Sequence, residues 1–273
     1  MGWIESMILG IIQGLTEFIP VSSQGHLIVF NDFYSVEYST GLTILQLNIL
    51  AHFGSLFAIV IYYFRTVLGL AKSIFFIIRP DIDRNANILL NLIISSIPIF
   101  FIGYYFAKYF NMNDDLILLI IGLSSIIFGI ILFFIDKFCL RIRGIDTISY
   151  AGSFFIGLSQ CLALIPGVSR SGAVLTFMRF NGFSRQNSVF YTNLMGIPVI
   201  FGAMGYLIIE NFYEVINYNF FNLYSFSIFI SSFLFSILFI HFFVSWVRNF
   251  SLALFVYYRV IFGIFVLFLF YYK

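Results

Sequence analysis

Six stretches of this sequence are apolar for about twenty residues or more, the length that an α-helix needs to cross the hydrocarbon core of a membrane. Only 10% of the 273 residues are charged, against about 25% in ordinary soluble domains. So few charges cannot cover a water-exposed surface, so we exclude a soluble globular domain and predict an all-α integral membrane protein, a single membrane domain over residues 1–273. The predicted spanning helices are 42–64, 86–107, 115–136, 186–209, 224–247 and 251–272.

Two further apolar stretches, 3–33 and 150–182, are interrupted at their centres by proline, glycine and serine. The first contains IPVSSQGH at 19–26, and the second contains IPGVSRSG at 165–172. Backbone that leaves the helix at membrane depth survives only where protein or a water-filled cavity satisfies its polar groups. We therefore predict that these stretches are two re-entrant helical hairpins.

The two halves of the chain resemble each other. A shift of 146 residues places the Ile-Pro pair and a serine of the first interrupted stretch on those of the second (Ile19, Pro20 and Ser23 on Ile165, Pro166 and Ser169), and a shift of 134 places IIFGI (126–130) on VIFGI (260–264). Repeat one (1–140) and repeat two (146–273) then each have one hairpin and three spanning helices. Because three is odd, the second half enters from the opposite face, as an inverted-topology repeat. The alternative is that Phe, Ile and Gly-rich helices resemble one another by composition alone.

Basic residues are distributed unequally between the two predicted faces. All Lys and Arg residues except Lys108 and Lys273 fall on the face of the connections 65–85, 137–149 and 248–250, or on the adjoining hairpin and helix ends. The positive-inside rule makes this face cytoplasmic, so we expect a multi-pass protein of the plasma membrane, surrounded by lipid, with both termini on the outer face. The net charge is only +2 and no basic tract is present, which excludes nucleic acid as a partner.

Ionisable side chains inside membrane segments are expensive to bury, so each is a candidate functional residue. Glu17 lies in the first predicted hairpin, and Gln13 precedes it by one helical turn on the same face. A buried carboxylate requires a cation, a proton or an arginine as its partner. We expect Glu17 to act in catalysis or metal binding and Gln13 to bind substrate; a purely structural ion pair with an arginine is the alternative.

Hydroxyl groups and an imidazole follow Pro20 at the start of a short predicted helix. His26 comes four residues after Ser22 and three after Ser23, spacings that bring an imidazole above a hydroxyl on one helix face. His26 is then either a general base for a serine or the nucleophile itself, and the sequence does not distinguish the two. The alternative is structural, because serine before a helix ordinarily caps it and a lone histidine is commonly a core residue.

The centre of the second predicted hairpin has the composition of an anion site. Gly167 permits a tight turn, Ser169 and Ser171 supply hydroxyls, and Arg170 supplies a planar fork of donors. Free N–H groups at a helix start together with a guanidinium are best matched to phosphate. The alternative is that Arg170 is a cytoplasmic anchor whose charged end reaches the interface.

Other polar residues inside the predicted spanning helices are less informative. His52 either lines a cavity with Asn48 or bonds to a neighbouring helix, and for His52 and Asn193 alike we favour packing.

A serine or histidine, a carboxylate and an arginine fork, contributed by two hairpins, favour phosphoryl chemistry on a lipid with a phosphorylated head. The competing interpretation is an inverted-repeat transporter or flippase for a phosphorylated lipid or anion, which would use Arg170 and Glu17 without a nucleophile.

Two long motifs resemble those of the undecaprenyl-diphosphatase family, membrane enzymes linked to bacitracin resistance. QGLTEFIPVSSQGHL (13–27) resembles the first family motif, in which Glu or Gln precedes a Glu by four residues and Ser-Ser and His follow. GLSQCLALIPGVSRSGA (157–173) resembles the second, a Pro-Gly-x-Ser-Arg-Ser signature. The similarity extends over essentially the whole chain in helix order and motif placement.

This resemblance implies hydrolysis of a C55-type isoprenyl diphosphate to the monophosphate and inorganic phosphate, which recycles a lipid carrier for cell-envelope glycan synthesis. It also implies a divalent cation such as Mg²⁺ or Ca²⁺, six spanning helices with two re-entrant pairs in an inverted repeat, and a homodimer. By position, Gln13 and Glu17 match the family's acidic pair, Ser23 and His26 match its hydroxyl and imidazole, and Ser169, Arg170 and Ser171 match its phosphate-binding signature.

Three positions bear on how closely the site follows the family. The pattern allows Gln13, but this residue removes one carboxylate, so metal binding would depend more on Glu17. Val174 stands where the second motif usually ends in Thr, and Gln24 stands where a small or hydroxyl residue is common. These two replacements bear on secondary phosphate contacts and on the choice of polyprenyl carrier, and they leave the core constellation intact.

Overall fold

The computed structural model describes residues 2–34, 42–109, 114–215 and 222–272. Within these ranges the regular structure is helical, apart from one isolated bridge between Arg143 and Phe183. Six helices there are long and apolar enough to cross a membrane, which confirms the predicted number of spanning helices. They are α4 (Ile44–Tyr62), α6 (Arg84–Tyr109), α7 (Asp114–Phe138), α10 (Arg185–Glu210), α12 (Leu223–Asn249) and α13 (Ala253–Tyr272).

The two interrupted stretches form pairs of shorter helices. Residues 3–33 contain α1 (Gly2–Thr16) and α2 (Ser23–Phe33), and residues 150–182 contain α8 (Tyr150–Gln160) and α9 (Arg170–Phe180). Even the longest, α1, has only 15 residues, fewer than the roughly 20 that a spanning helix needs. The remaining elements are α5 (Phe64–Lys72), α11 (Phe212–Val215) and three 3₁₀ turns (Ser73–Phe76, Ile145–Thr147 and Cys161–Leu164).

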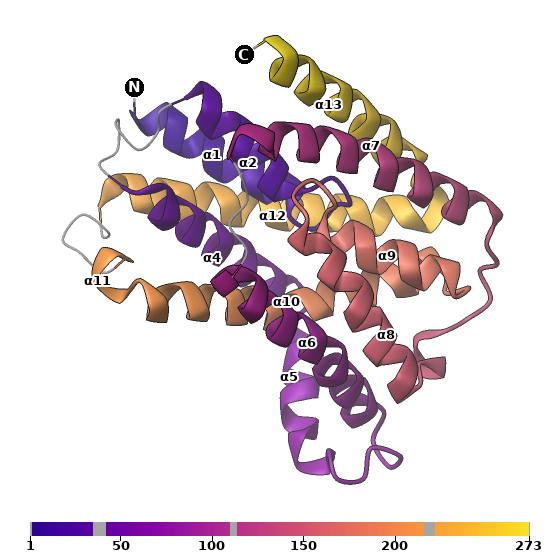
Figure 1. Cartoon of the computed structure of the whole chain (residues 1–273). Helices are drawn as coiled ribbons and strands as arrows, with labels where there is room; N and C mark the ends of the chain where they lie inside the picture. The colour runs from indigo at the N-terminus through magenta and orange to yellow at the C-terminus, as the bar shows by residue number, and fades with distance from the viewer. Residues whose placement is uncertain (1, 35–41, 110–113, 216–221, 273) are drawn as a thin grey trace.

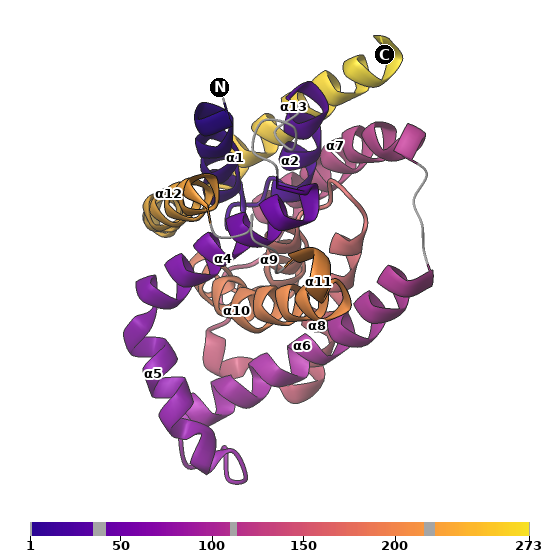
Figure 2. The ribbon, with the colours of Figure 1, turned by 90° about the vertical axis from the view of Figure 1, so that its left-hand side faces the viewer.

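The long helices surround the two helix breaks, 17–22 and 161–169 (Figure 1). Helix α12 packs against both α1 and α4, α7 packs against α13, and α6 packs against α8. The start of α1 and the end of α13 lie at the same end of the molecule, opposite the connection that follows α5 (Figures 1 and 2). The terminal residues Met1 and Lys273 lie outside the described residues.

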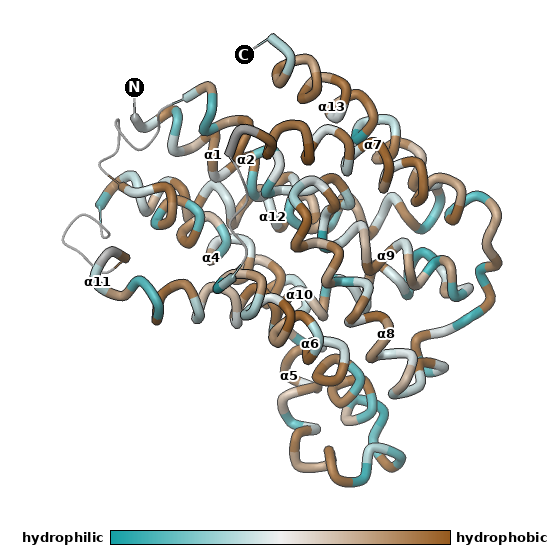
Figure 3. Tube along the Cα trace, viewed as in Figure 1, coloured by the Kyte–Doolittle hydropathy of each residue, from teal (hydrophilic) through white to brown (hydrophobic). Residues whose placement is uncertain are grey.

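Hydropathy follows this arrangement. Hydrophobic residues run along the lengths of the long helices, and hydrophilic ones gather at the connections between α5 and α6 and between α7 and α8 (Figure 3). Those connections contain the sequences RPDIDR (79–84) and RIRGID (141–146). Both belong to the face that the sequence predicts to be basic.

A buried ion cluster fastens α9 to its neighbours at the end away from Arg170. Asp136 of α7, with 4% of its side chain exposed, accepts hydrogen bonds from Arg179 Nε of α9 at 3.0 Å and from Arg185 Nη2 of α10 at 2.7 Å. It also accepts the backbone N–H of Leu252, just before α13, at 3.1 Å. One carboxylate therefore links four helices, and each buried charge has a partner of opposite sign.

Glycines allow α1 and α4 to approach α12 closely. A Cβ at Gly14 would lie 2.6 Å from the carbonyl oxygen of Ser232, and one at Gly54 would lie 2.5 Å from that of Phe229 and 2.8 Å from Cβ of Ser232. Small residues at such contacts let two helix backbones pack in lipid, where burying apolar surface provides no drive.

We expect Gly54→Ala to destabilise the protein by about 1–3 kcal/mol, because the new methyl group overlaps the backbone of α12. Gly205→Ala in α10 is the matched control, since a Cβ there meets nothing within 4 Å. Thermal unfolding in detergent should give a lower midpoint for Gly54→Ala and an equal or higher midpoint for Gly205→Ala. Equal effects of the two substitutions would contradict the close approach of α4 and α12.

Candidate functional site

The two helix breaks contact each other in the middle of the bundle. Ser171 Oγ donates to the carbonyl oxygen of Ile19 at 2.8 Å. Arg170 Nη2 donates to Glu17 Oε1 at 3.0 Å, and only 13% and 6% of these two side chains are exposed. The structure thus brings together the carboxylate of the first break and the guanidinium of the second, as the sequence predicts.

Each break ends in a serine with a positive φ. Ser22 caps α2 and Ser169 caps α9, with φ of 75° and 72°, a region that residues other than glycine seldom adopt. Their hydroxyls accept the N–H of Gly25 at 3.4 Å and of Gly172 at 3.1 Å.

Ser22 and Ser169 therefore correspond at a separation of 147 residues. The pairing of Ser23 with Ser169 at a shift of 146 is wrong by one residue, because Gly167 adds a residue between proline and cap in the second break. From the caps onward Ser23 therefore corresponds to Arg170, whereas before the prolines the shift of 146 still holds and Gln13 corresponds to Ser159.

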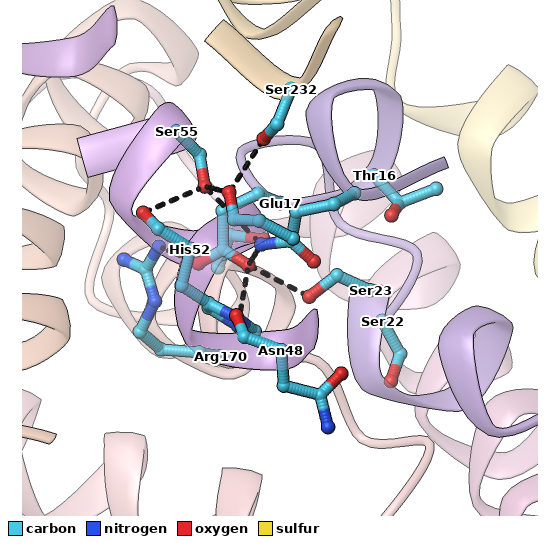
Figure 4. Close-up of polar contacts among 12 residues, drawn as sticks. Thr16, Glu17, Ser22, Ser23, Asn48, His52, Ser55, Arg170 and Ser232 are labelled. Atoms are coloured by element: carbon cyan, nitrogen blue, oxygen red, sulfur yellow. Dashed lines mark hydrogen bonds and ion pairs between the residues drawn. The ribbon is translucent and has the colours of Figure 1, made fainter. Parts of the chain in front are cut away.

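Glu17 is the centre of a buried hydrogen-bond network (Figure 4). Its Oε2 accepts from Gln13 Nε2 at 2.9 Å and from Ser23 Oγ at 2.8 Å. His52 Nε2 lies 3.7 Å from the same oxygen. Arg170 and Ser23 approach Glu17 from opposite sides, so the carboxylate has a cationic neighbour on one side and a hydroxyl on the other.

A cavity of about 420 Å³ opens beside this network. Its polar lining comes from both breaks and from the helices around them: Glu17, Ser22, Ser23, Gln24, Asn31, Asn48, His52, Gln160, Ser169 and Arg170. The rest of the lining is apolar and includes Ile99 of α6 and Val199 and Ala203 of α10. A polar end beside an apolar wall is suited to an amphiphile with an anionic head.

Three predicted site residues support the cavity from behind instead of lining it. Gln13 contacts it through Glu17, and Ser171 is bonded to Ile19 as described. Gly167, at φ 90°, lies against α7, where a Cβ would meet the backbone of Ile121. Gly167 therefore shapes the break, in line with the tight turn that the sequence predicts there.

His26 does not make the contact with a serine hydroxyl that the spacing predicts. Its Nδ1 lies 2.7 Å from the carbonyl oxygen of Ser22, and its Nε2 lies 2.6 Å from the hydroxyl of Tyr258. A carbonyl partner requires the proton on Nδ1, so Nε2 accepts from Tyr258. The ring also stacks on Phe262 at 3.9 Å between centroids, which holds it against α13 and away from the cavity lining.

His52 is the histidine that faces Glu17, although the sequence favours packing for it. Its Nδ1 bonds to the carbonyl oxygen of Asn48 at 2.8 Å, and both residues line the cavity. Asn193, by contrast, bonds across to the Tyr63 hydroxyl at 3.3 Å, as the packing interpretation predicts. The sequence feature that indicated this position for His52 is Asn48, a second polar residue one turn earlier on the same helix face.

Arg259 of α13 links the two breaks by hydrogen bonds. The sequence did not predict this role, because Arg259 was grouped with the basic residues of the predicted cytoplasmic face. It is 1% exposed, and its donors reach the carbonyl oxygens of Pro20 at 3.4 Å, Gly167 at 2.9 Å, Val168 at 3.0 Å and Ser125 at 3.3 Å. Five fixed donors on one guanidinium suit this task. The available signal was an arginine in the middle of an apolar helix.

The residues around Glu17 fit a divalent cation that shares its ligands with a substrate. Among the described residues no group of three or more His, Cys, Asp or Glu could hold a metal ion alone. Gln13 Oε1 and Asn48 Oδ1, however, are buried without a hydrogen-bond partner in the described part of the chain. Magnesium is commonly held by one or two carboxylates together with substrate phosphates, a pattern that these oxygens and Glu17 match.

Comparison with known proteins places the chain in a family. A family model described as Bacitracin resistance protein BacA matches residues 6–265. The chain belongs to this family. Its relatives include the undecaprenyl-diphosphatases of Pelagibacter ubique (35% identity over 96% of this chain and 95% of the relative) and of Persephonella marina (33% identity over 98% and 99%). That of Prochlorococcus marinus strain MIT 9515 is 33% identical over 98% and 99%. The resemblance drawn from the two motifs is confirmed.

We expect Arg259→Lys to lower the stability by about 2 kcal/mol or more, because one ammonium group cannot reach carbonyls on both breaks and each buried, unpaired carbonyl costs about 1–3 kcal/mol. Arg65→Lys is the matched control at an exposed position. Thermal unfolding in detergent should separate the two variants. An Arg259→Lys protein as stable as Arg65→Lys would show that the breaks hold their positions without the guanidinium.

Proposed function

We propose that this protein hydrolyses a polyprenyl diphosphate of the undecaprenyl type to the monophosphate and inorganic phosphate, in the bacterial cell membrane, and so recycles a lipid carrier for cell-envelope glycan synthesis. The names of its relatives support this proposal. The single observation that carries it is the contact of Glu17 with both Arg170 and Ser23 beside one cavity. A transporter or flippase is not favoured, because it would need no hydroxyl bonded to the carboxylate.

Arg170 and the start of α9 are the proposed phosphate-binding group. The guanidinium is held by Glu17 at 3.0 Å and by the carbonyl oxygen of Thr192 at 3.3 Å. These bonds fix its plane while leaving further N–H donors for an anion. The positive end of α9 adds to the attraction for phosphate, and Ser169 and Ser171 hold that helix start in place.

Ser23 is the proposed nucleophile and Glu17 the proposed base. Ser23 Oγ already donates to Glu17 Oε2 at 2.8 Å, within the range for proton transfer. As the Ser23 oxygen bonds to the terminal phosphorus, its proton passes to Glu17, and the bridging oxygen leaves with the lipid monophosphate. Water then cleaves the phosphoserine to release inorganic phosphate and restore Ser23. The distances favour this route over attack by His26, whose ring nitrogens are bonded to Ser22 and Tyr258.

A divalent cation, Mg²⁺ or Ca²⁺, would be held by Glu17, Gln13 Oε1 and Asn48 Oδ1 together with phosphate oxygens of the substrate. When bound, it would neutralise the charge that builds up during phosphoryl transfer.

The proposed membrane placement follows the same reasoning. The helix pairs α1–α2 and α8–α9 would be re-entrant hairpins of an inverted repeat, supported by their short helices and by the matching caps at Ser22 and Ser169. The basic connections would face the cytoplasm and both termini the outer side. A homodimer is proposed from the family resemblance alone.

Purified protein should release phosphate from farnesyl diphosphate, and Ser23→Ala should reduce the rate by roughly 100-fold or more, since it removes the nucleophile while leaving Arg170 and Glu17 in place. A colorimetric phosphate assay in detergent measures both. Bound lipid without any phosphate release would favour the transporter, and full activity in Ser23→Ala would assign the attack to another group.

Arg170→Lys keeps the charge but loses the planar fork. We expect a loss of at least about 2 kcal/mol in transition-state stabilisation, roughly a 30-fold drop in kcat/KM. The measurement is steady-state phosphate release, with the Arg65→Lys variant as the matched control. Near-normal kcat/KM in Arg170→Lys would contradict the phosphate-binding assignment.

A further inference from the structure

Gln160 is a buried amide that the proposed chemistry leaves unused. It ends α8, is 0% exposed, and lines the same cavity as Glu17, Ser169 and Arg170. Neither its Nε2 nor its Oε1 has a hydrogen-bond partner among the described residues. Exchanging the two amide atoms therefore does not satisfy the group.

A buried amide without partners is unfavourable, because on folding it loses its hydrogen bonds to water and forms none within the protein. The backbone that holds Gln160 cannot shift easily toward another partner, since α8 is fixed one turn earlier. A Cβ at Gly157 would lie 2.9 Å from the carbonyl carbon of Ser95 and 3.0 Å from Cδ of Pro98, so α8 is in direct contact with α6 there. The amide is thus held at the wall of the cavity.

The glutamine of the first helix pair indicates what Gln160 lacks. Each pair has a glutamine in the last turn of its first helix, Gln13 in α1 and Gln160 in α8. Gln13 Nε2 donates to a carboxylate oxygen of Glu17 at 2.9 Å. The second break has no carboxylate at this place and presents Arg170 to the cavity instead, so the anion for the Gln160 amide has to come from a bound molecule.

We propose that Gln160 is a substrate-binding residue whose Nε2–H donates to a phosphate oxygen of the polyprenyl diphosphate, next to Arg170. This rests on the proposed function, and it adds to it a neutral donor from α8. Arg170 attracts the anion by charge, whereas an amide fixed on another helix restricts how the diphosphate is oriented.

The decisive variant is Gln160→Met, which keeps the length of the side chain and removes only the unpaired polar atoms. We expect the thermal midpoint of the ligand-free protein to be unchanged or raised, because no protein hydrogen bond is lost. We expect KM for farnesyl diphosphate to rise by about tenfold or more, and the increase in thermal midpoint on adding farnesyl diphosphate to shrink. A purely structural residue would instead lower the ligand-free midpoint and leave KM unchanged, and that pattern would overturn the proposal.

Ser236→Ala is the matched control. Ser236 Oγ is also buried without a partner among the described residues, but it lies on α12 and outside the cavity lining. It should leave KM and the ligand-induced shift unchanged, and a rise in KM equal to that of Gln160→Met would overturn the proposal.

Gln160→Glu tests whether the group bound at this position is negatively or positively charged. A carboxylate should repel phosphate and raise KM more than Met does, whereas a lower KM would mean that the amide oxygen faces a cation and would reject our assignment.

Failure of the proposed function is distinguishable from failure of this inference, because wild-type protein would then release no phosphate from farnesyl diphosphate. The thermal shift still reports binding in that case, and its absence in wild type as well as in Gln160→Met would reject Gln160 as a binding residue.

Discussion

Backbone groups that leave a helix inside a membrane must find partners within the protein, and this constraint organises the structure around the two breaks. Arg259 donates to carbonyls of both breaks, and Ser124 Oγ donates to that of Pro166 at 2.6 Å. The caps at Ser22 and Ser169 accept the N–H groups that begin the next helices. The polar groups that satisfy the breaks also bring Glu17 and Arg170 within 3.0 Å.

Local features of the sequence were enough to predict the architecture. The six spanning helices follow from apolar length, and the two helix pairs follow from prolines and serines inside apolar stretches. The sequence also predicted that Glu17 has a cationic partner such as an arginine, because a buried charge needs a partner and lipid supplies none. The proposed repeat remains a prediction, supported locally by the two caps.

The sequence could not predict which spanning helices pack against the two breaks, or on which face of each break they lie. Helical spacing correctly placed His26 one turn beyond the break, but α13 packs on that face, so Tyr258 and Phe262 surround the imidazole. His52, on α4, lies 35 residues after Glu17 in the chain and reaches it only once the protein is folded. Arg259 was hidden in the same way, since its acceptors come from three separate segments.

Helix α9 is held at both ends, by Glu17 and the first break at Arg170 and by Asp136 at Arg179. The helix has only eleven residues, so it behaves as a short rigid rod. Tolerance to substitution should consequently not increase with distance from the cavity along this rod. Replacing Asp136 or Arg185, at the far end of α9, should therefore disturb the cavity as a replacement beside it would.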